Sequence, residues 1–284
     1  MMLSRRFLLC GAVSLCAGSA QAACLGDAEV QALMDHYTAR QPAANPEGLS
    51  VVDGRCTRAK LHKLLEGKFG APIGYKAGLT NPAVQKRFNH DAPVWGALYA
   101  PMLLNSGAIV EAGFGARPLF EADLLVRVSG TAVNQARTVD EVLAAIDQVI
   151  PFIELPDLVV QAPGKLDGPA ISAINVGARL GVLGAPIAVQ RTAAFSDALR
   201  DMVTVVKGDG VELDRGKGSD VLEHPLNAVV WLAQDLARDG LAMKPGDLIS
   251  LGSFSKLLPP KPGLAVQVQY LGLPGDPVVS VSFK

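Results

Sequence analysis

Apolar residues recur along the chain with two different periods, and the period changes after the first quarter of the sequence. Residues 27–40 and 57–69 repeat their apolar positions every three or four residues, which predicts two amphipathic helices. Pro42 and Pro46 interrupt the pattern between them, so residues 41–53 are expected to form a loop. Residues 23–73 therefore predict a small helical segment that precedes a larger unit, residues 74–284.

Strands dominate the prediction for the larger unit. Apolar runs, several of them alternating with polar residues, predict strands at residues 119–128, 202–206, 247–251, 266–270 and 279–283. A helix is expected over residues 138–149, where Thr138 and Glu141 form a capping box and Pro151 ends the helix. A second helix is expected over residues 224–240, which begin next to a proline and end at a glycine. Residues 156–172 predict a loop.

The strand predicted at 119–128 carries two acidic side chains on one face. Side chains two residues apart in a strand point the same way, so Glu121 and Asp123 must project together, opposite an apolar row. Adjacent carboxylates repel each other unless they share a proton, meet a basic side chain or bind a hard divalent cation. Glu154, in a similar apolar setting, could complete a three-carboxylate site. A solvated strand face beside Arg127 is the alternative, and spacing alone leaves both open.

A lysine between glycines is the second candidate. Lys76 lies in the otherwise apolar segment Gly74-Tyr-Lys-Ala-Gly-Leu-Thr80. Flanking glycines allow a ligand to approach closely, and a partly buried lysine is suited to proton transfer or carboxylate binding. A surface lysine whose alkyl chain packs on the protein while its ammonium group stays in water fits the same pattern. Both interpretations stay open.

The N-terminus has the three parts of a secretory signal peptide. Arg5 and Arg6 supply positive charge, residues 7–17 are apolar but too few to span a bilayer comfortably, and Ala20-Gln-Ala22 is a cleavage site. Residues 1–22 are therefore expected to be removed, leaving a periplasmic or secreted protein without stable membrane insertion. The paired arginines also resemble a twin-arginine signal, so the export route stays open. A retained membrane anchor is the alternative.

Composition narrows the range of partners. The 284 residues carry a net charge of −1 and no basic block, which argues against a nucleic-acid partner. Glycine-rich turns at residues 208–219 lack the spacing of a phosphate-binding loop, which excludes that form of nucleotide binding.

Of the four cysteines, Cys10 and Cys16 lie in the predicted signal peptide. Cys24 and Cys56 remain and predict a disulfide in an oxidising compartment, with two unrelated thiols as the alternative.

Four segments match one known family in order: the Lys76 segment, Glu121-Ala-Asp123, Glu154, and the long run at residues 216–233. Through them, residues 55–284 resemble the 2-oxopent-4-enoate hydratase and 4-oxalocrotonate decarboxylase branch of the fumarylacetoacetate hydrolase superfamily. The resemblance implies an α+β fold, a mixed β-roll or sandwich of the fumarylacetoacetate hydrolase C-terminal type with flanking helices. It also implies a Mg²⁺ or Mn²⁺ cofactor, a small 2-oxo or 2-hydroxy-dienoic acid as substrate, and a homo-oligomer.

The same resemblance gives the candidate residues their roles. Glu121, Asp123 and Glu154 would be metal ligands, and Lys76 would move a proton or hold the substrate carboxylate. The substrate-binding residues would also include Leu79 and Asn175. A substrate carboxylate and C2 oxygen can chelate one hard cation, which stabilises negative charge on the C2 oxygen. A hydratase then adds water to the conjugated acid, and a decarboxylase or C–C hydrolase of the superfamily would use the same electron sink.

Departures from the family keep a non-catalytic interpretation open. Val94 stands where relatives commonly have an acid, and Asp91 is the nearby acid that could replace it. The segments around Asn175 and at residues 251–260 also differ from the family pattern. An exported protein that binds a 2-oxo acid or a metal without turnover is therefore the alternative to a lyase.

Overall fold

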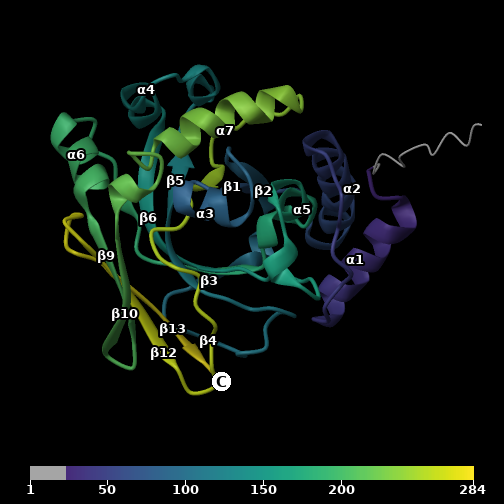
Figure 1. Ribbon diagram of the computed structural model, residues 1–284. Helices are drawn as coiled ribbons and strands as arrows, with labels where there is room; N and C mark the ends of the chain where they lie inside the picture. The colour runs from purple at the N-terminus through teal and green to yellow at the C-terminus, as the bar shows by residue number, and fades with distance from the viewer. Residues whose placement is uncertain (1–23) are drawn as a thin grey trace, which may run out of the picture.

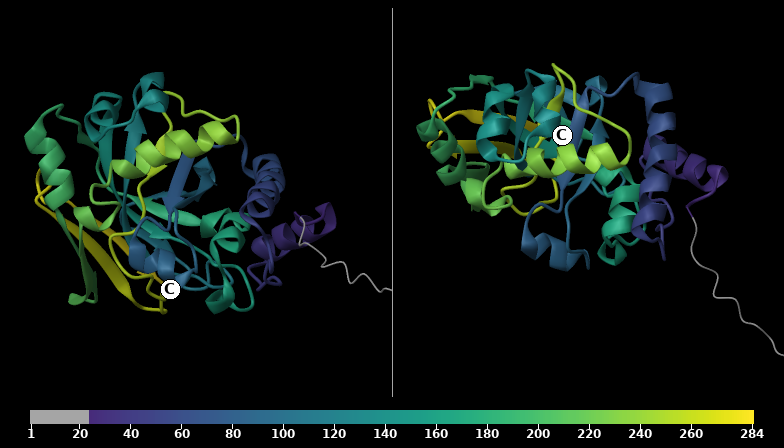
Figure 2. Two further views of the ribbon diagram at one scale, coloured as in Figure 1. Left: turned by 45° about the horizontal axis from the view of Figure 1, so that its top comes forward. Right: turned by 90° about the horizontal axis from the view of Figure 1, so that it is seen from above.

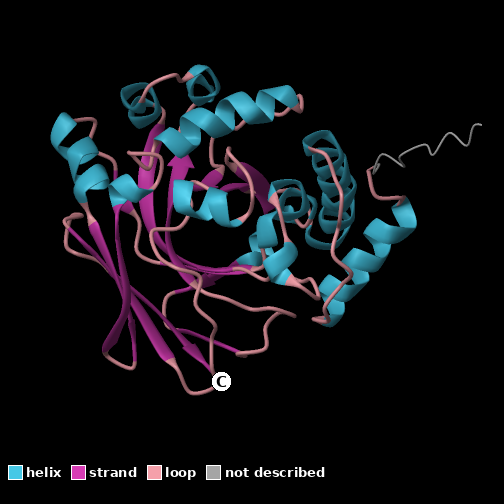
Figure 3. Cartoon of the chain, viewed as in Figure 1, coloured by secondary structure: helices cyan, strands magenta, loops and turns pink. Residues whose placement is uncertain are grey.

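Residues 24–284, which the computed structural model describes, form two mixed β-sheets with helices around them (Figures 1 and 3). The larger sheet runs in the order β2 (Val94–Leu98), β1 (Gly74–Gly78), β11 (Leu248–Ser250), β5 (Glu121–Val128), β6 (Ile146–Leu155), β7 (Leu180–Leu183) and β3 (Leu103–Asn105), with the short β8 (Ile187–Ala188) beside β6. The second sheet runs β10 (Val211–Lys217), β9 (Val203–Gly208), β12 (Ala265–Leu271), β13 (Val278–Phe283) and β4 (Ala108–Val110). Each sheet contains parallel and antiparallel pairs, so the predicted α+β fold with mixed sheets is confirmed.

The α-helices of the described residues are α1 (Asp27–Ala39), α2 (Val51–Phe69), α3 (Pro82–Arg87), α4 (Val139–Ala144), α5 (Gly168–Ala173), α6 (Ala193–Asp201) and α7 (Asn227–Arg238). In both views of Figure 2, α1 and α2 stand at the opposite end of the molecule from the five-stranded sheet. α7 crosses the top of the molecule in Figure 1 and buries one side in the main core, because its apolar residues fall on a single face.

The helical N-terminal segment forms, but its second helix begins at Val51 rather than at residue 57. Ser50 caps this helix: its hydroxyl accepts a hydrogen bond from the Asp53 backbone N–H at 3.2 Å, and the Asp53 carboxylate accepts one from the Ser50 N–H at 3.1 Å. Gly54, inside the added turn, lets α2 approach α5, because a Cβ there would lie 2.6 Å from the Pro169 carbonyl oxygen. The helix prediction was too short because residues 41–53 were expected to be loop.

The N-terminal segment shares a core with the larger sheet. Its apolar side chains, among them Val30, Leu33 and Leu61, pack in one cluster with Leu125 and Phe152 of the sheet. Cys24 and Cys56 are joined in a disulfide, which ties the first described residue to α2. The helical segment and the sheet are therefore stabilised together.

The acidic strand is buried on both faces, which the alternation pattern did not show. Its apolar row enters the main core, while Leu125 on the acidic face enters the second core. Glu121 and Asp123 are 8% and 0% exposed, so the solvated-face alternative is wrong. Arg127 does not reach them and instead pairs with Asp147 at 2.7 Å.

The helix predicted over residues 138–149 ends early. The capping box at Thr138 forms, but α4 stops at Ala144 and residues from Ile146 onward belong to β6. Pro151 lies inside this strand rather than ending a helix, opposite Leu124 of β5. β6 is covered on both faces, so its apolar run is continuous and mimics a helical stripe over a short window.

The later elements lie close to their predictions. The helix expected over residues 224–240 spans Asn227–Arg238, and His224 just before it accepts a hydrogen bond from the Leu226 N–H at 3.1 Å. The loop expected over residues 156–172 contains the start of α5 at Gly168. The predicted signal peptide, residues 1–22, lies outside the described residues. Within residues 24–284, no helix combines the length and apolar character needed to cross a membrane.

Candidate active site

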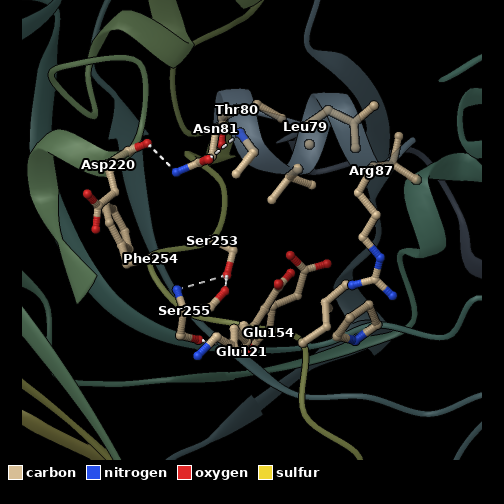
Figure 4. A pocket seen from close by; sticks show the side chains of 18 of the residues that line it. Leu79, Thr80, Asn81, Arg87, Glu121, Glu154, Asp220, Ser253, Phe254 and Ser255 are labelled. Atoms are coloured by element: carbon tan, nitrogen blue, oxygen red, sulfur yellow. Dashed lines mark hydrogen bonds between the residues drawn. The ribbon is translucent and has the colours of Figure 1, made fainter. Parts of the chain in front are cut away.

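A cavity of about 360 Å³ lies between β1, α3 and the neighbouring ends of β5 and β6, and residues 253–257 border it (Figure 4). Three of its charged side chains, Lys76, Glu121 and Glu154, come from the larger sheet and are defined here as the acidic end. Most of the remaining wall is apolar, formed by Leu79, Val84, Phe88, Leu158, Ile171 and Val176. The space and this mixture of groups suit a small organic acid.

Glu121 and Glu154 are direct cross-strand neighbours, since their Cα atoms are paired in the register of β5 and β6. Both side chains are buried and both line the cavity. Like charges directly opposite each other destabilise a sheet, and burial adds a desolvation cost. The pair is therefore stable only with a shared proton or a compensating cation.

Lys76 supplies part of that compensation. The residue is 3% exposed, its ammonium group forms an ion pair with Glu154, and it donates a hydrogen bond to the Val176 carbonyl oxygen at 2.9 Å. Gly78 permits this arrangement, because a Cβ there would lie 2.4 Å from the Val176 Cγ1 atom. The alternative of a solvent-exposed Lys76 ammonium group is wrong.

Asp123 is held against β11. Its Oδ2 accepts a hydrogen bond from the Ser250 hydroxyl at 2.5 Å, and its Oδ1 accepts from the Leu251 and Gly252 N–H groups at 3.2 and 3.0 Å. Across residues 24–284, no group of three or more His, Cys, Asp and Glu side chains is arranged to hold a metal ion. The structure thus brings Glu121 and Glu154 together at the cavity, while a three-carboxylate ligand set stays a prediction.

The acidic end holds two carboxyl groups and one lysine, and Asp123 lies two residues from Glu121 on β5. Burial and then the charge of Glu154 raise the pKa of Glu121 well above its usual range. The same two causes raise the pKa of Asp123 to about 7. These buried oxygens are the ligands that hard divalent cations prefer, so the donor chemistry fits Mg²⁺ or Mn²⁺. The geometry fits for Glu121 and Glu154, provided that Lys76 moves off Glu154.

Of the three predicted substrate-binding residues, Lys76 and Leu79 line the cavity and Asn175 does not. The Asn175 Oδ1 atom accepts from the Ala97 N–H at 2.7 Å and lies 2.8 Å from His62 Nε2. These bonds fix the turn at Asn175–Gly177, whose Val176 carbonyl contacts Lys76. Asn175 therefore affects the site by positioning the lysine.

Several cavity residues had no signal in the sequence. Arg87 lines the cavity from α3, and Figure 4 shows its side chain directed into it. Ser253 and Ser255 line the opposite side, from residues 251–260, a segment in which the sequence shows only a departure from the family pattern. Asp91, the proposed replacement for an acid at Val94, is exposed beside a separate, smaller pocket and does not line this cavity.

Similar proteins of known name show which family this chain belongs to, although no family model matches it. The chain is 31% identical to 2-oxo-hept-4-ene-1,7-dioate hydratase of Escherichia coli over 216 residues, which cover 73% of this chain and 78% of that protein. It is 30% identical to 2-keto-4-pentenoate hydratase 2 of Dechloromonas aromatica over 203 residues, covering 71% and 75%.

Solved structures share the fold. The structure of 4-oxalocrotonate decarboxylase from Pseudomonas putida G7, complexed with magnesium and adipate, superposes with a TM-score of 0.80 and 24% identity, covering 91% of this chain and 97% of that one. The fold and relatives together make this chain a member of the fumarylacetoacetate hydrolase superfamily. Within it, the chain belongs to the branch that contains 2-keto-4-pentenoate hydratases and 4-oxalocrotonate decarboxylases.

Proposed function

We propose that this protein is an exported, divalent-metal-dependent lyase of the 2-oxopent-4-enoate hydratase type. The observation that carries the proposal is the buried pair of Glu121 and Glu154, set directly opposite each other in a small cavity and only partly neutralised by Lys76. Relatives named as hydratases, at about 30% identity, support a hydratase-like reaction on a small 2-oxo acid.

Glu121 and Glu154 would hold the divalent cation. The substrate carboxylate and C2 oxygen would chelate that cation, which would stabilise negative charge on the C2 oxygen. Asp123 would become a third ligand only by leaving its hydrogen bonds to Ser250 and Gly252. Magnesium in the related decarboxylase structure supports a metal cofactor for this chain, with Mg²⁺ or Mn²⁺ as the candidates.

Lys76 would handle protons at the head of the substrate. Its Nζ atom lies at the acidic end, held by the Glu154 carboxylate and the Val176 carbonyl. When the contact with Glu154 is lost, Nζ can donate to the substrate carboxylate or exchange a proton with the adjacent carbon. The apolar walls, including Leu79 and Phe88, would keep bulk water from the substrate tail. In a hydratase, the dienol ketonises, the double bond moves into conjugation, and water adds at C4.

A decarboxylase or C–C hydrolase would use the same acidic end, and relatives of the hydratase and decarboxylase classes match the chain. One observation favours a non-catalytic 2-oxo-acid or metal-binding protein: Val94 replaces the expected acid, and Asp91 does not reach the cavity. The retained, buried Lys76 favours an enzyme.

Export and assembly belong to the same proposal. Arg5, Arg6 and the Ala20-Gln-Ala22 site support secretion, and the Cys24–Cys56 disulfide suits an oxidising compartment. N-terminal sequencing of protein recovered from the periplasm or medium should begin after Ala22, and recovery in the cytoplasm with residue 1 intact would contradict export. The homo-oligomer that the family resemblance implies stays a prediction, checked by light scattering.

Turnover of 2-hydroxypenta-2,4-dienoate tests the function directly. The mature protein with Mg²⁺ should consume the dienol, followed by ultraviolet absorbance, and form 4-hydroxy-2-oxopentanoate. Lys76→Ala should lower the rate about 100-fold or more, because general acid–base groups contribute roughly 10²- to 10⁴-fold. Lys256→Ala removes a cation from the cavity mouth that is already paired with Asp214, and is the matched control.

Absence of product with both Mg²⁺ and Mn²⁺ would contradict the hydratase proposal. Release of CO₂ from 4-oxalocrotonate would then favour the decarboxylase. Full activity in Lys76→Ala would refute the role assigned to the lysine.

A further inference from the structure

A tyrosine hydroxyl from the second sheet contacts the two strands that carry the acidic residues. Tyr270 lies on β12, is 0% exposed, and packs in the main core with Ala122 and Ile153. Its hydroxyl oxygen lies 2.7 Å from the Asp123 carbonyl oxygen and 2.6 Å from the Phe152 carbonyl oxygen. It also accepts a hydrogen bond from the Phe152 N–H at 3.1 Å. Because Asp123 and Phe152 are paired in the register of β5 and β6, the hydroxyl bonds the backbone of both strands at one cross-strand pair.

This hydroxyl adds a contact that a regular ladder does not have. In a regular antiparallel sheet, the backbone N–H and C=O groups of a hydrogen-bonded pair bond each other directly. Here a side chain more than a hundred residues away in sequence reaches the same groups. A hydroxyl has one hydrogen to donate, so the carbonyl groups of Asp123 and Phe152 share it. The spacing of β5 and β6 at this pair therefore depends on the Tyr270 hydroxyl.

The acidic pair lies next to this contact. Glu121 and Glu154 are two residues further along the same two strands, on the same face as Asp123 and Phe152. Two residues span about 7 Å of strand, so a change in spacing at one pair alters the separation of the two carboxylates at the other. Tyr270 approaches from the main core and does not line the cavity. It therefore acts on the site through the strand backbone and does not touch a ligand.

We propose that Tyr270 is a positioning residue that fixes the separation of the Glu121 and Glu154 carboxylates and so selects the size of the cation that they hold. This inference rests on the proposed function, because the two carboxylates must first be metal ligands. Mg²⁺ requires near-ideal octahedral geometry with oxygen ligands at about 2.0–2.1 Å, whereas Ca²⁺ accepts varied geometry at about 2.3–2.6 Å. A pair of carboxylates that loses its fixed spacing therefore loses affinity for Mg²⁺ before it loses affinity for Ca²⁺.

Tyr270→Phe tests the inference, because it removes the hydroxyl and keeps the ring. Dissociation constants for Mg²⁺ and for Ca²⁺ are measured by calorimetry on the mature wild-type protein and on the variant, without substrate. The affinity for Mg²⁺ should fall about tenfold and the affinity for Ca²⁺ less than about threefold, since residues that support metal ligands contribute roughly 10- to 100-fold. A role in stability alone would lower Tm and leave the ratio of the two constants unchanged.

Two control variants remove buried hydroxyl groups that form no hydrogen bond to β5 or β6 in the described structure. Tyr99 is 1% exposed and donates to the His62 carbonyl at 3.4 Å, so Tyr99→Phe makes the same chemical change elsewhere. Thr204 is the cross-strand neighbour of Tyr270 on β9, and its buried hydroxyl has no hydrogen-bond partner among residues 24–284. Thr204→Val therefore changes the same part of the core. Both controls should keep the wild-type ratio of the two constants.

Reciprocal coupling gives a second measurement that needs no variant. If the Tyr270 hydroxyl favours Mg²⁺, then Mg²⁺ must stabilise the Tyr270 contact in return. Hydrogen-exchange mass spectrometry of the wild type should therefore show that saturating Mg²⁺ protects the Phe152 amide more than saturating Ca²⁺ does.

The outcomes separate this inference from the proposed function. An unchanged ratio in Tyr270→Phe, an equal change in the two controls or, where Tyr270→Phe does not fold, equal protection of the Phe152 amide by both cations would overturn the role of Tyr270 and leave the metal site standing. Failure of the wild type to bind either cation would overturn the proposed function, and this inference with it.

Discussion

Replacing Lys76 by methionine tests whether this lysine neutralises the buried carboxylates. The side chains of Lys76 and Glu154 are each 4% exposed, so their ion pair is almost fully removed from water. Methionine fills similar space without charge and leaves Glu154 beside Glu121 with no cation. Removing one partner of a buried ion pair costs about 3–5 kcal/mol. For a chain of this size, that corresponds to a fall of roughly 10 °C in Tm.

The assay is urea unfolding followed by tryptophan fluorescence and circular dichroism, first in EDTA and then with Mg²⁺. In EDTA, Lys76→Met should be about 3–5 kcal/mol less stable than the wild type. Mg²⁺ should restore more stability to the variant than to the wild type, because the lysine no longer competes for Glu154. A cation at 100 times its dissociation constant adds about 2.7 kcal/mol by mass action.

Two further variants separate charge from packing. Lys76→Met combined with Glu154→Gln removes both charges and should recover most of the lost stability. Lys256→Met breaks an ion pair whose lysine is 81% exposed, so the cost should be below about 1 kcal/mol. The reasoning is refuted if Lys76→Met is within 1 kcal/mol of the wild type in EDTA, or if Mg²⁺ stabilises both proteins equally.

Further predictions concern the support of the site. Burial lowers the pKa of His62 from 6.5 to about 4, so protonation of the unfolded chain should remove stability as the pH falls from about 6.5 to about 4. Its contribution has an upper bound of roughly 3 kcal/mol, and His62→Gln should flatten that part of the curve of unfolding free energy against pH. Reduction of the Cys24–Cys56 disulfide, which spans a sequence separation of 32, should cost about 3–4 kcal/mol, and an unchanged urea midpoint in dithiothreitol would argue against it. In Gly96→Ala, the new Cβ would lie 2.5 Å from the Asn175 carbonyl oxygen, so metal-dependent activity should fall while the circular dichroism spectrum stays unchanged.

The sequence predicted the parts of the fold that local pattern determines. Strand periodicity correctly placed Glu121 and Asp123 in one strand, and the C-terminal strands form within a residue or two of their predicted bounds. The hydrophobic pattern predicted a helix where β6 begins, because a strand covered on both faces shows no alternation of apolar and polar residues. Burial of the acidic face was equally invisible, since it depends on helices and strands distant in sequence.

The cavity residues also divide into those that a local motif predicts and those that only the fold brings together. Lys76 and Glu154 were identified from short motifs, yet their ion pair results from the fold, which places β1 and β6 in one sheet with β11 and β5 between them. The hydrogen bonds that hold Asp123 come from Ser250 and the turn after it, more than a hundred residues away in sequence. Arg87 lies in a short exposed helix, where an arginine is ordinary, so its place in the cavity follows only from the fold.

The most direct test of the account is the thermal unfolding of the mature protein with Mg²⁺, with oxalate, and with both. Oxalate reproduces the two oxygens that a 2-oxo acid presents to a cation, whatever the rest of the substrate. The account predicts that oxalate raises Tm only when Mg²⁺ is present, because a ligand of the native state stabilises it by mass action. Glu121→Gln and Glu154→Gln should each remove this effect. No shift with both ligands present, or a shift from oxalate that ignores Mg²⁺ and both substitutions, would contradict a metal-dependent 2-oxo acid site at Glu121 and Glu154.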